Sequence, residues 1–260
     1  MKADFDEAAA SYDSNFTDSF VGRMQRNIVL DHLQELLRDK GIRKVLEINC
    51  GTGEDALWLE KQNLEVTATD ISEKMIEVAK SKMNHSKVIF KQADINSLSE
   101  SFAGEKFDLI LSNFGGLNCL RQEQINNFFQ NSASLLTDTG KMLLVIMPKN
   151  TIWEQFYFLM KGNAKSAFRR KQGSAQANVS GSTIPTYYYN PGELAVMASA
   201  HFKLIKTNPV GFFVPPSYLD PHLKNRRWLA SLLGRLDTAV KNFSILAQYA
   251  DHYSIILSKK

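Results

Sequence analysis

The sequence predicts a parallel α/β fold that is interrupted by two insertions. Three observations support this prediction. Short apolar runs alternate with helical patterns over the first 150 residues, a glycine-rich turn joins the first run to a helix, and the alternation breaks after Pro148. Strands that alternate with helices along a chain form βαβ units, whose strands run parallel.

Five runs in the first part of the chain are typical of buried strands: Arg43–Ile48, Glu65–Asp70, Lys87–Gln92, Phe107–Ser112 and Lys141–Met147. Helical spacing of apolar residues covers Arg23–Asp39, Glu54–Gln62, Ser72–Met83 and Gln122–Leu136. These elements alternate in chain order, as the fold requires.

After Pro148, strands and helices no longer alternate regularly. An aromatic-rich helix is expected over Thr151–Phe168, followed by a polar loop and a short strand over Tyr187–Tyr189. Asn190-Pro191 is typical of a helix N-cap and first helical residue. The last two strands are expected over Phe202–Thr207 and Tyr253–Ser258. We expect the two insertions to pack together as a helical cap.

The chain therefore divides into four parts. Residues 1–40 would form an N-terminal lid and first helix, and 41–148 the cofactor-binding core. Residues 149–201 and 214–251 are cap or substrate insertions. Residues 202–213 and 252–260 return to the core as its final strands.

The composition is that of an ordinary soluble globular protein, with 44% hydrophobic and 22% charged residues. Cys50 and Cys119 are too few for a disulfide framework or a zinc site, and the acidic N-terminal stretch lacks the apolar region of a signal peptide. We therefore expect a cytoplasmic protein without a transmembrane segment.

Charge is distributed unevenly along the chain. Residues 1–150 hold 17 Lys and Arg against 22 Asp and Glu (net −5), whereas residues 151–260 hold 14 against 5 (net +9). The basic half could meet an anionic partner or be a solvated surface.

The stretch VLEINCGTGEDA carries the main functional signal. Gly51 permits a tight turn between strand and helix, and Gly53 lets a ligand approach the main chain. Asp70 ends the next strand, 19 residues after Gly51, where it can accept hydrogen bonds from both ribose hydroxyls of a nucleoside. Glu47 precedes the loop, where it would repel a pyrophosphate and attract an ammonium. This charge favours S-adenosylmethionine over a dinucleotide.

At this point the chain resembles the class I S-adenosylmethionine-dependent methyltransferases. The segments that carry the resemblance are VLEINCGTG, VTATDISEKMIEVAK, FKQADI, FDLILSN and LLTDTGKMLLVIM. The resemblance implies a Rossmann-like, doubly wound sheet of seven strands with an antiparallel last strand. It implies S-adenosyl-L-methionine as cofactor and S-adenosyl-L-homocysteine as product.

The resemblance also implies roles for residues near the methionine and ribose parts of the cofactor. Glu47, Gly51 and Gly53 should face the methionine part, and Asp70 should hold the ribose. Arg26, on the first helix, could pair with the cofactor carboxylate or be a solvated residue.

A second group of residues should surround the adenine. Ile71 and Met75 should flank the ring, and Asp94 with the backbone of Ile95 should contact its edge. In many small-molecule members a Tyr in a phrase like FDEAAASYD, here Tyr12, closes over the cofactor. We expect residues 1–20 and Gly173–Thr183 to be mobile without ligand and to close when cofactor and substrate bind.

The substrate is a separate question, because one fold hosts many chemistries. Asn113, after the fourth strand, should lie near the transferring methyl. Enzymes that methylate nucleobase or amide nitrogens carry an Asn/Asp-Pro-Pro-aromatic tetrapeptide there, whereas Phe114-Gly115-Gly116 follows here. We expect a small, partly hydrophobic or lipid-like acceptor, with O-methylation ahead of N- or C-methylation, and no metal.

Candidate bases can be ranked by topology, because ligands bind outside the carboxyl ends of parallel strands. The last strand runs the other way, so its beginning lies at that edge. His252 is therefore a candidate general base with Asp251 nearby, or part of a structural polar cluster. His201 precedes a parallel strand and should be structural. Tyr188 could line the pocket or simply pack.

Two alternatives stay open. The basic half could hold RNA or a protein substrate, although nucleic acid is less favoured because no RNA-binding appendage is recognisable. The chain could also be a non-catalytic module that retains the nucleoside site. The apolar stripe from Leu229 to Phe243, flanked by Lys224, Arg227 and Arg235, could lie on a membrane surface or be buried as a cap helix.

Overall fold

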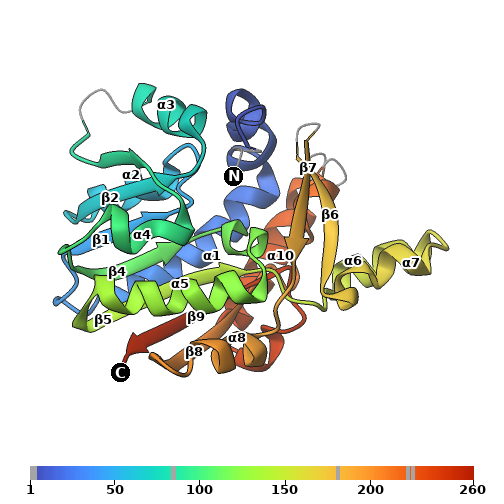
Figure 1. The fold of residues 1–260 in the computed structure, drawn as a ribbon. Helices are drawn as coiled ribbons and strands as arrows, with labels where there is room; N and C mark the ends of the chain where they lie inside the picture. Colours follow the sequence, from blue (N-terminus) through green and yellow to red (C-terminus); the bar gives the residue numbers. More distant parts are fainter. Residues whose placement is uncertain (1–4, 83–85, 180–181, 221–222, 224–225) are drawn as a thin grey trace.

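The computed structural model of the chain describes residues 5–82, 86–179, 182–220, 223 and 226–260. Its centre is a seven-stranded sheet with the order β3-β2-β1-β4-β5-β9-β8 (Figure 1). The strands are β1 (Lys44–Ile48), β2 (Glu65–Asp70), β3 (Ile89–Gln92), β4 (Phe107–Ser112), β5 (Leu136–Ile146), β8 (Phe202–Val210) and β9 (His252–Lys259). Strands β1 to β5 pair in parallel, whereas β9 runs antiparallel to both β5 and β8. The predicted sheet with an antiparallel last strand is confirmed.

Helices cover both faces of this sheet. One face carries α1 (Phe20–Leu36), α2 (Glu54–Lys61) and α3 (Glu73–Ser81), and the other carries α4 (Leu98–Ser101), α5 (Gln122–Leu135) and α8 (Pro191–Ala198). Successive strand residues point to opposite faces, so Val45 packs in the first layer and Leu46 in the second. The central strands are largely apolar because both of their faces are buried.

The register brings the candidate site to one edge of the sheet. Ile48, at the end of β1, pairs with Thr69 of β2 and with Ser112 of β4. Ile146, at the end of β5, pairs with Tyr253 of the antiparallel β9. The loops after β1, β2 and β4 and the start of β9 therefore meet at the carboxyl edge of the parallel strands.

The first insertion differs from the prediction in its helix. The expected single helix over residues 151–168 is two helices, α6 (Ile152–Met160) and α7 (Ala164–Ala167). Gly162 lies between them with a φ of 69°, a left-handed conformation that ends α6. The two helices extend away from the body of the molecule (Figure 1).

The prediction of a polar loop over residues 173–186 is wrong, because most of this stretch forms a hairpin. Strands β6 (Ser174–Val179) and β7 (Ser182–Tyr187) pair antiparallel over six residue pairs. The hairpin has tertiary support: Asn118 Nδ2 donates to the carbonyl of Tyr187 (2.5 Å). The small polar residues that suggested a loop thus lie in a strand pair, and Tyr188 follows the strand instead of lying within it.

The second insertion packs against the N-terminal helix. Helix α10 (Arg227–Val240) buries Ala230, with Leu229 and Leu233 beside it, against Val21 and Met24 of α1. The apolar stripe is therefore only partly buried, and Trp228, Leu232 and Leu236 of α10 remain exposed. Of the flanking cations, Lys224 lies outside the described residues.

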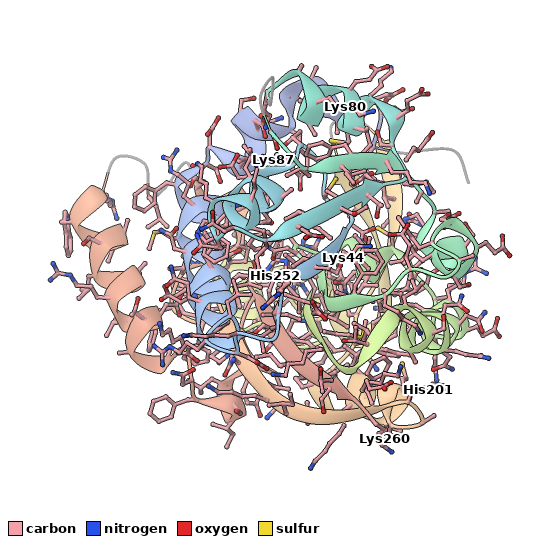
Figure 2. All side chains as sticks on the ribbon, turned by 90° about the vertical axis from the view of Figure 1, so that its left-hand side faces the viewer. Lys44, Lys80, Lys87, His201, His252 and Lys260 are labelled. Carbon is pink, nitrogen blue, oxygen red and sulfur yellow. The ribbon has the colours of Figure 1, made fainter. Side chains whose placement is uncertain are left out.

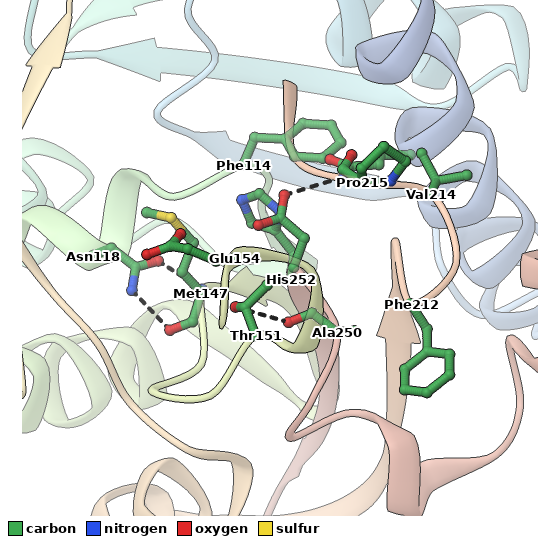
Figure 3. Close-up of polar contacts among 12 residues, drawn as sticks. Phe114, Asn118, Met147, Thr151, Glu154, Phe212, Val214, Pro215, Ala250 and His252 are labelled. Carbon is green, nitrogen blue, oxygen red and sulfur yellow. Dashed lines mark hydrogen bonds and ion pairs between the residues drawn. The ribbon is translucent and has the colours of Figure 1, made fainter. Parts of the chain in front are cut away.

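The two insertions meet at one place, close to the start of β9. The Ile152 N–H donates to the Tyr249 carbonyl (3.1 Å), and Thr151 Oγ1 donates to the Ala250 carbonyl (3.3 Å; Figure 3). The cap elements thus approach the candidate site from two sides. The proposed division of the chain into lid, core and insertions stays a prediction.

Several element ends differ from the predicted ones. Strand β5 begins at Leu136 and not at Lys141, and β8 continues to Val210. Met83, the expected end of the third helix, lies outside the described residues. Short turns complete the chain: η1 (Ala9–Ser11), η2 (Asp13–Thr17), η3 (Ile95–Ser97), η4 (Gly116–Cys119), η5 (Arg169–Gln172), η6 (Ser217–Leu219) and η7 (Ser244–Leu246).

Candidate active site

The glycine loop joins β1 to α2 through three residues with positive φ. Asn49, Gly51 and Gly53 have φ values of 57°, 51° and 81°. Asp70 at the end of β2 fixes this shape, because its Oδ2 accepts from the Gly51 N–H (2.9 Å) and its Oδ1 from the Ser72 N–H (2.9 Å). Burial raises the pKa of Asp70, against these backbone donors. Each carboxylate oxygen can accept a second hydrogen bond, so ribose hydroxyls could still be held there.

Four polar side chains from four elements gather behind this loop. We call Glu47 of β1, Arg26 of α1, Asp55 of α2 and Asn113 after β4 the glycine-loop cluster. Arg26 Nη1 lies 2.5 Å from Asp55 Oδ1, and Asn113 Nδ2 donates to Asp55 Oδ2 (2.9 Å). Asp55 is therefore a central acid of the site that the sequence prediction missed. Its position in the first turn of the helix after the glycines was the available signal.

Glu47 is the exceptional member of this cluster. Only 2% of the residue is exposed, and its Oε2 has no hydrogen-bond partner among the described residues. Burial, and then the neighbouring Asp55, raise the pKa of Glu47 well above its usual value, whereas Arg26 opposes this shift. Arg26 Nε is also without a hydrogen-bond partner in the described part of the chain. One buried acceptor and one buried donor are thus available for a ligand.

The N-terminal segment covers the glycine loop. Thr52 Oγ1 donates to Asp13 Oδ1 (2.6 Å), and Asp13 pairs with Lys82 (2.5 Å). The Tyr12 ring lies over Gly51, since a Cβ added to Gly51 would be 3.6 Å from Tyr12 Cε1. Burial raises the pKa of Tyr12 to about 12. The cavity that remains at the loop is about 20 Å³, far below the roughly 300–1,000 Å³ of small-molecule pockets.

The residues expected around adenine lie beside Asp70. Met75 is buried and packs against Ala8 and Ala9 of the N-terminal segment. Ile71 is half-buried, as are Asp94 and Ile95. Asp94 accepts from the Asn96 N–H (2.8 Å) and so caps the turn that follows β3. The Ala93 N–H donates to the Asp70 carbonyl (3.0 Å), which brings the β3 end to the β2 end.

A second buried charge cluster lies at the start of β9. We call Glu154 of α6, Arg170 of η5, Asp251 and His252 the Arg170 cluster. Arg170 Nε lies 2.9 Å from Glu154 Oε2, and its Nη2 lies 2.9 Å from Asp251 Oδ1. Asp251 Oδ2 also accepts from Gln25 Nε2 of α1 (3.1 Å). Neither Glu154 nor Arg170 was singled out for the site by sequence, because their pairing depends on the path of the insertion.

His252 lies where the topology placed it, at the carboxyl edge of the parallel strands. Its Nδ1 lies 3.2 Å from Asp251 Oδ2. Burial alone would raise the pKa of Asp251, but His252 and Arg170 outweigh it and hold that pKa well below its usual value. His201 lies at a distant edge beside Lys260 (Figure 2).

Phe114 connects the two clusters. Its ring lies 5.5 Å from the His252 ring (Figure 3) and 5.3 Å from the Arg26 guanidinium. Phe16 of the N-terminal segment contacts its other side at 5.2 Å. Phe114 has a φ of 45°, which is unusual for a residue with a side chain and marks a constrained position. The sequence prediction noted Phe114 only as a departure from a motif and missed this role.

Tyr188 is buried beneath the Arg170 cluster. The Arg170 guanidinium lies 5.3 Å from its ring centre. Burial raises the pKa of the Tyr188 hydroxyl, whereas Arg170 opposes this shift. These contacts explain its burial without a role in chemistry, and the catalytic role considered for Tyr188 stays an untested prediction.

Two further properties bound the function. Within the described ranges, no group of three or more His, Cys, Asp or Glu side chains is arranged to hold a metal ion. Every helix in that part of the chain is too short or too polar to span a bilayer.

Comparison with known proteins identifies the part of the chain that carries the glycine loop. Residues 45–140 match a family model described as a methyltransferase domain. The chain is 34% identical over 130 residues to malonyl-[acyl-carrier protein] O-methyltransferase of Bacillus cereus, covering 48% of this chain and 46% of that protein. It is 32% identical over 130 residues to glycine N-methyltransferase of Oryctolagus cuniculus, covering 44% and 43%. The chain thus spans about half the length of the curated relatives it matches.

The fold comparison covers more of the molecule. Magnesium protoporphyrin IX methyltransferase of Synechocystis PCC 6803, solved with bound S-adenosylhomocysteine, superposes with a TM-score of 0.58 at 15% identity. The superposition covers 93% of this chain and 86% of that one. The sheet topology and the glycine loop with Asp70 agree with the methyltransferase domain that residues 45–140 match.

Proposed function

We propose that this protein transfers a methyl group from S-adenosylmethionine to a small, partly hydrophobic acceptor, at oxygen in preference to nitrogen or carbon. The observation that carries the cofactor assignment is the pair of unpartnered atoms in the glycine-loop cluster. Glu47 offers an acceptor and Arg26 a donor, both buried next to the loop. The amino-acid end of S-adenosylmethionine carries an ammonium and a carboxylate, which match these two groups in charge.

The other predicted residues fit the rest of the cofactor. Asp70 keeps acceptor capacity for the ribose, and Met75 with Ile71 would lie against the adenine. The cofactor supplies an activated methyl group on a sulfonium, so the protein has to bind, align and exclude water. Tyr12 and Asp13 would serve the last task by holding the N-terminal segment over the loop.

Aromatic side chains support a partly hydrophobic acceptor. Phe16 and Phe114 lie between Tyr12, which covers the glycine loop, and His252. Of the two relatives described above, one is named as an O-methyltransferase of a carrier-bound malonyl group and the other as an N-methyltransferase of glycine. The preference for oxygen rests on the absence of the tetrapeptide typical of nitrogen-methylating enzymes after Asn113.

His252 is the candidate for a general base. Its Nδ1 lies 3.2 Å from the Asp251 carboxylate but makes no hydrogen bond of good geometry among the described residues. A proton on Nδ1 would leave Nε2 to accept a proton from the acceptor. Arg170 holds Asp251 in place, so the imidazole is oriented by the insertion. The role of His252 would be to remove the hydroxyl proton as the new bond to the methyl forms.

An RNA or protein substrate is the less favoured alternative. Arg169 and Arg170, part of the basic cluster that could meet such a polymer, are bound to Glu154. A buried or paired guanidinium contributes little to binding of an anionic polymer. We also infer a cytoplasmic location, because Cys50 and Cys119 are too few for a disulfide framework.

The test uses S-adenosylmethionine labelled on its methyl group. The protein is incubated with a panel of small hydroxy, carboxylic and amino compounds and, separately, with total RNA. We expect label in the organic-soluble small molecules, loss of that label in Asp70→Ala, and a slower reaction in His252→Gln. Label in RNA but in no small molecule would contradict the proposed substrate class.

A further inference from the structure

Helix α6 exposes an apolar stripe that nothing in the described structure covers. Its four large exposed side chains are Ile152, Phe156, Leu159 and Met160, of which Phe156 is 58% and Met160 74% exposed. Phe156, Leu159 and Met160 follow Ile152 by four, seven and eight residues, which places all four side chains on one side of the helix. The helix projects from the body of the molecule together with α7 (Figure 1), so this side faces outward.

The cations next to this stripe point to an anionic partner. We call residues 152–171 the α6–α7 arm. Residues 151–175 hold five Lys and Arg and a single acid, Glu154, and that acid is buried against Arg169 and Arg170. Lys161, Lys165 and Lys171 are exposed. The surface of the arm is therefore apolar and cationic, without an exposed acid.

Two of these lysines lie over aromatic rings of the arm. Lys161 Nζ lies 4.3 Å from the centre of the Tyr157 ring, and Lys171 Nζ lies 4.9 Å from that of Phe168. Phe168 itself is partly exposed. Aromatic rings with long cationic side chains beside them are typical of segments that lie at the boundary between lipid headgroups and acyl chains.

We propose that the α6–α7 arm binds the surface of a membrane that contains anionic lipids. The stripe from Ile152 to Met160 would enter the acyl boundary, while Lys161, Lys165 and Lys171 would lie among the lipid phosphates and carboxylates. A bilayer accepts a protruding convex helix without a matching groove, which a protein partner would have to supply. A second copy of this chain fits less well, because its arm carries the same cations and no exposed acid to pair with them.

The arm is also joined to the candidate active site. Glu154 on the buried side of α6 binds Arg170, which binds Asp251 next to His252. Membrane binding would therefore place the candidate acceptor site close to the lipid surface. The proposal does not require methyltransferase activity, because it concerns only the exposed side of the arm.

Vesicle flotation tests the proposal directly. The full chain is mixed with vesicles of phosphatidylcholine alone or of phosphatidylcholine with phosphatidylserine, and the bound fraction is measured after centrifugation. We expect binding to the vesicles with phosphatidylserine and little to those without it. Binding to neither kind of vesicle would overturn the proposal. Equal binding to both kinds would contradict the requirement for anionic lipids.

Matched variants locate the contact. Phe156→Ser with Met160→Ser should abolish binding, whereas Val196→Ser, which changes an equally exposed residue of α8 (74%), should leave it unchanged. Lys161→Gln with Lys165→Gln should weaken binding roughly tenfold or more, because each cation near an anionic surface contributes. The control for charge is Lys40→Gln with Lys203→Gln, two exposed lysines elsewhere. Equal binding by arm variants and controls would contradict the proposal.

Sedimentation without vesicles tests whether a second copy of the chain covers the stripe instead of a membrane. If the protein forms dimers that Phe156→Ser with Met160→Ser dissociates, and does not bind vesicles, the stripe is an interface between two copies and the membrane proposal is wrong. Thermal unfolding of each variant checks that it is folded, which is expected because the changed side chains are exposed.

Discussion

The two buried charge clusters of this protein share two carboxylates and one guanidinium in different arrangements, and they differ in the fourth member, Asn113 in one and His252 in the other. Each buries two carboxylates and one guanidinium at the carboxyl edge of the sheet. In the Arg170 cluster the guanidinium binds both acids, at 2.9 Å each. In the glycine-loop cluster Arg26 binds Asp55, and Glu47 Oε2 has no hydrogen-bond partner among the described residues. In the first arrangement both acids are bound by the guanidinium, and in the second one acid keeps capacity for a ligand.

The pKa values of the buried acids reflect this difference. The pKa of Asp251 is held well below its usual value, whereas that of Glu47 is raised well above it, although both side chains are buried. A paired buried acid stabilises the fold when ionised, and an unpaired one destabilises it. We infer that the Arg170 cluster positions the insertion and His252. The glycine-loop cluster lowers the stability of the free protein but allows it to bind a ligand.

The largest expected effect concerns the two arginines. Arg170→Met leaves Glu154 and Asp251 buried without their shared partner, so it should lower the free energy of unfolding by about 3–5 kcal/mol. Arg26→Met should cost less, about 1–3 kcal/mol, because only Asp55 loses a direct partner. Urea denaturation of both variants measures the difference. Equal losses of unfolding free energy in the two variants would show that the two clusters do not differ in how they stabilise the fold.

A second effect separates the clusters by pH. Asp251 has a folded-state pKa below its unfolded value of 3.8, so its contribution is present above that pH and is lost as the pH falls further. Asp251→Asn should therefore lower the unfolding free energy by about 2 kcal/mol near neutral pH, because it removes a charged partner of Arg170. The gap to the wild type should narrow below pH 3.8 in urea titrations. A gap that stays constant with pH would contradict the assigned ionisation.

A smaller effect of opposite sign is expected at Glu47. Its folded-state pKa lies above the unfolded value of 4.5, so stability is greatest below that pH and is lost as the pH rises through the folded-state pKa. Without cofactor, Glu47→Gln should therefore be more stable than the wild type near neutral pH, by about 1 kcal/mol or more. The two proteins should become equally stable below pH 4.5. A destabilised variant at neutral pH would mean that Glu47 is already satisfied.

The glycine-loop side of the molecule was largely predictable from the sequence. The strand ends that carry Glu47, Asp70 and Asn113 follow from apolar runs, and parallel pairing brings such ends together. Met75 and Tyr12 came from the family resemblance, and Tyr12 lies over Gly51 and packs against the cluster that contains Met75. Local patterns decided these positions because the core strands are buried on both faces.

The other side was less predictable, because long-range contacts decide it. The β6–β7 hairpin contains small polar residues that are typical of loops, and Asn118 supports it from a distant part of the chain. The pairing of Glu154 with Arg170 depends on how Gly162 turns the chain. Phe114 adopts its constrained backbone because its ring lies between Phe16 and His252, which no local pattern encodes.

The most direct test of the central claim compares two ligands of the glycine loop by calorimetry. S-adenosylhomocysteine carries the amino-acid end, and 5′-methylthioadenosine lacks it while keeping the adenine and ribose. We predict that Glu47→Gln weakens binding of S-adenosylhomocysteine roughly tenfold or more, because an ammonium loses its ionised acceptor, and leaves binding of 5′-methylthioadenosine unchanged. If both ligands lose the same affinity, or S-adenosylhomocysteine loses none, the glycine-loop cluster does not bind the amino-acid end of the cofactor.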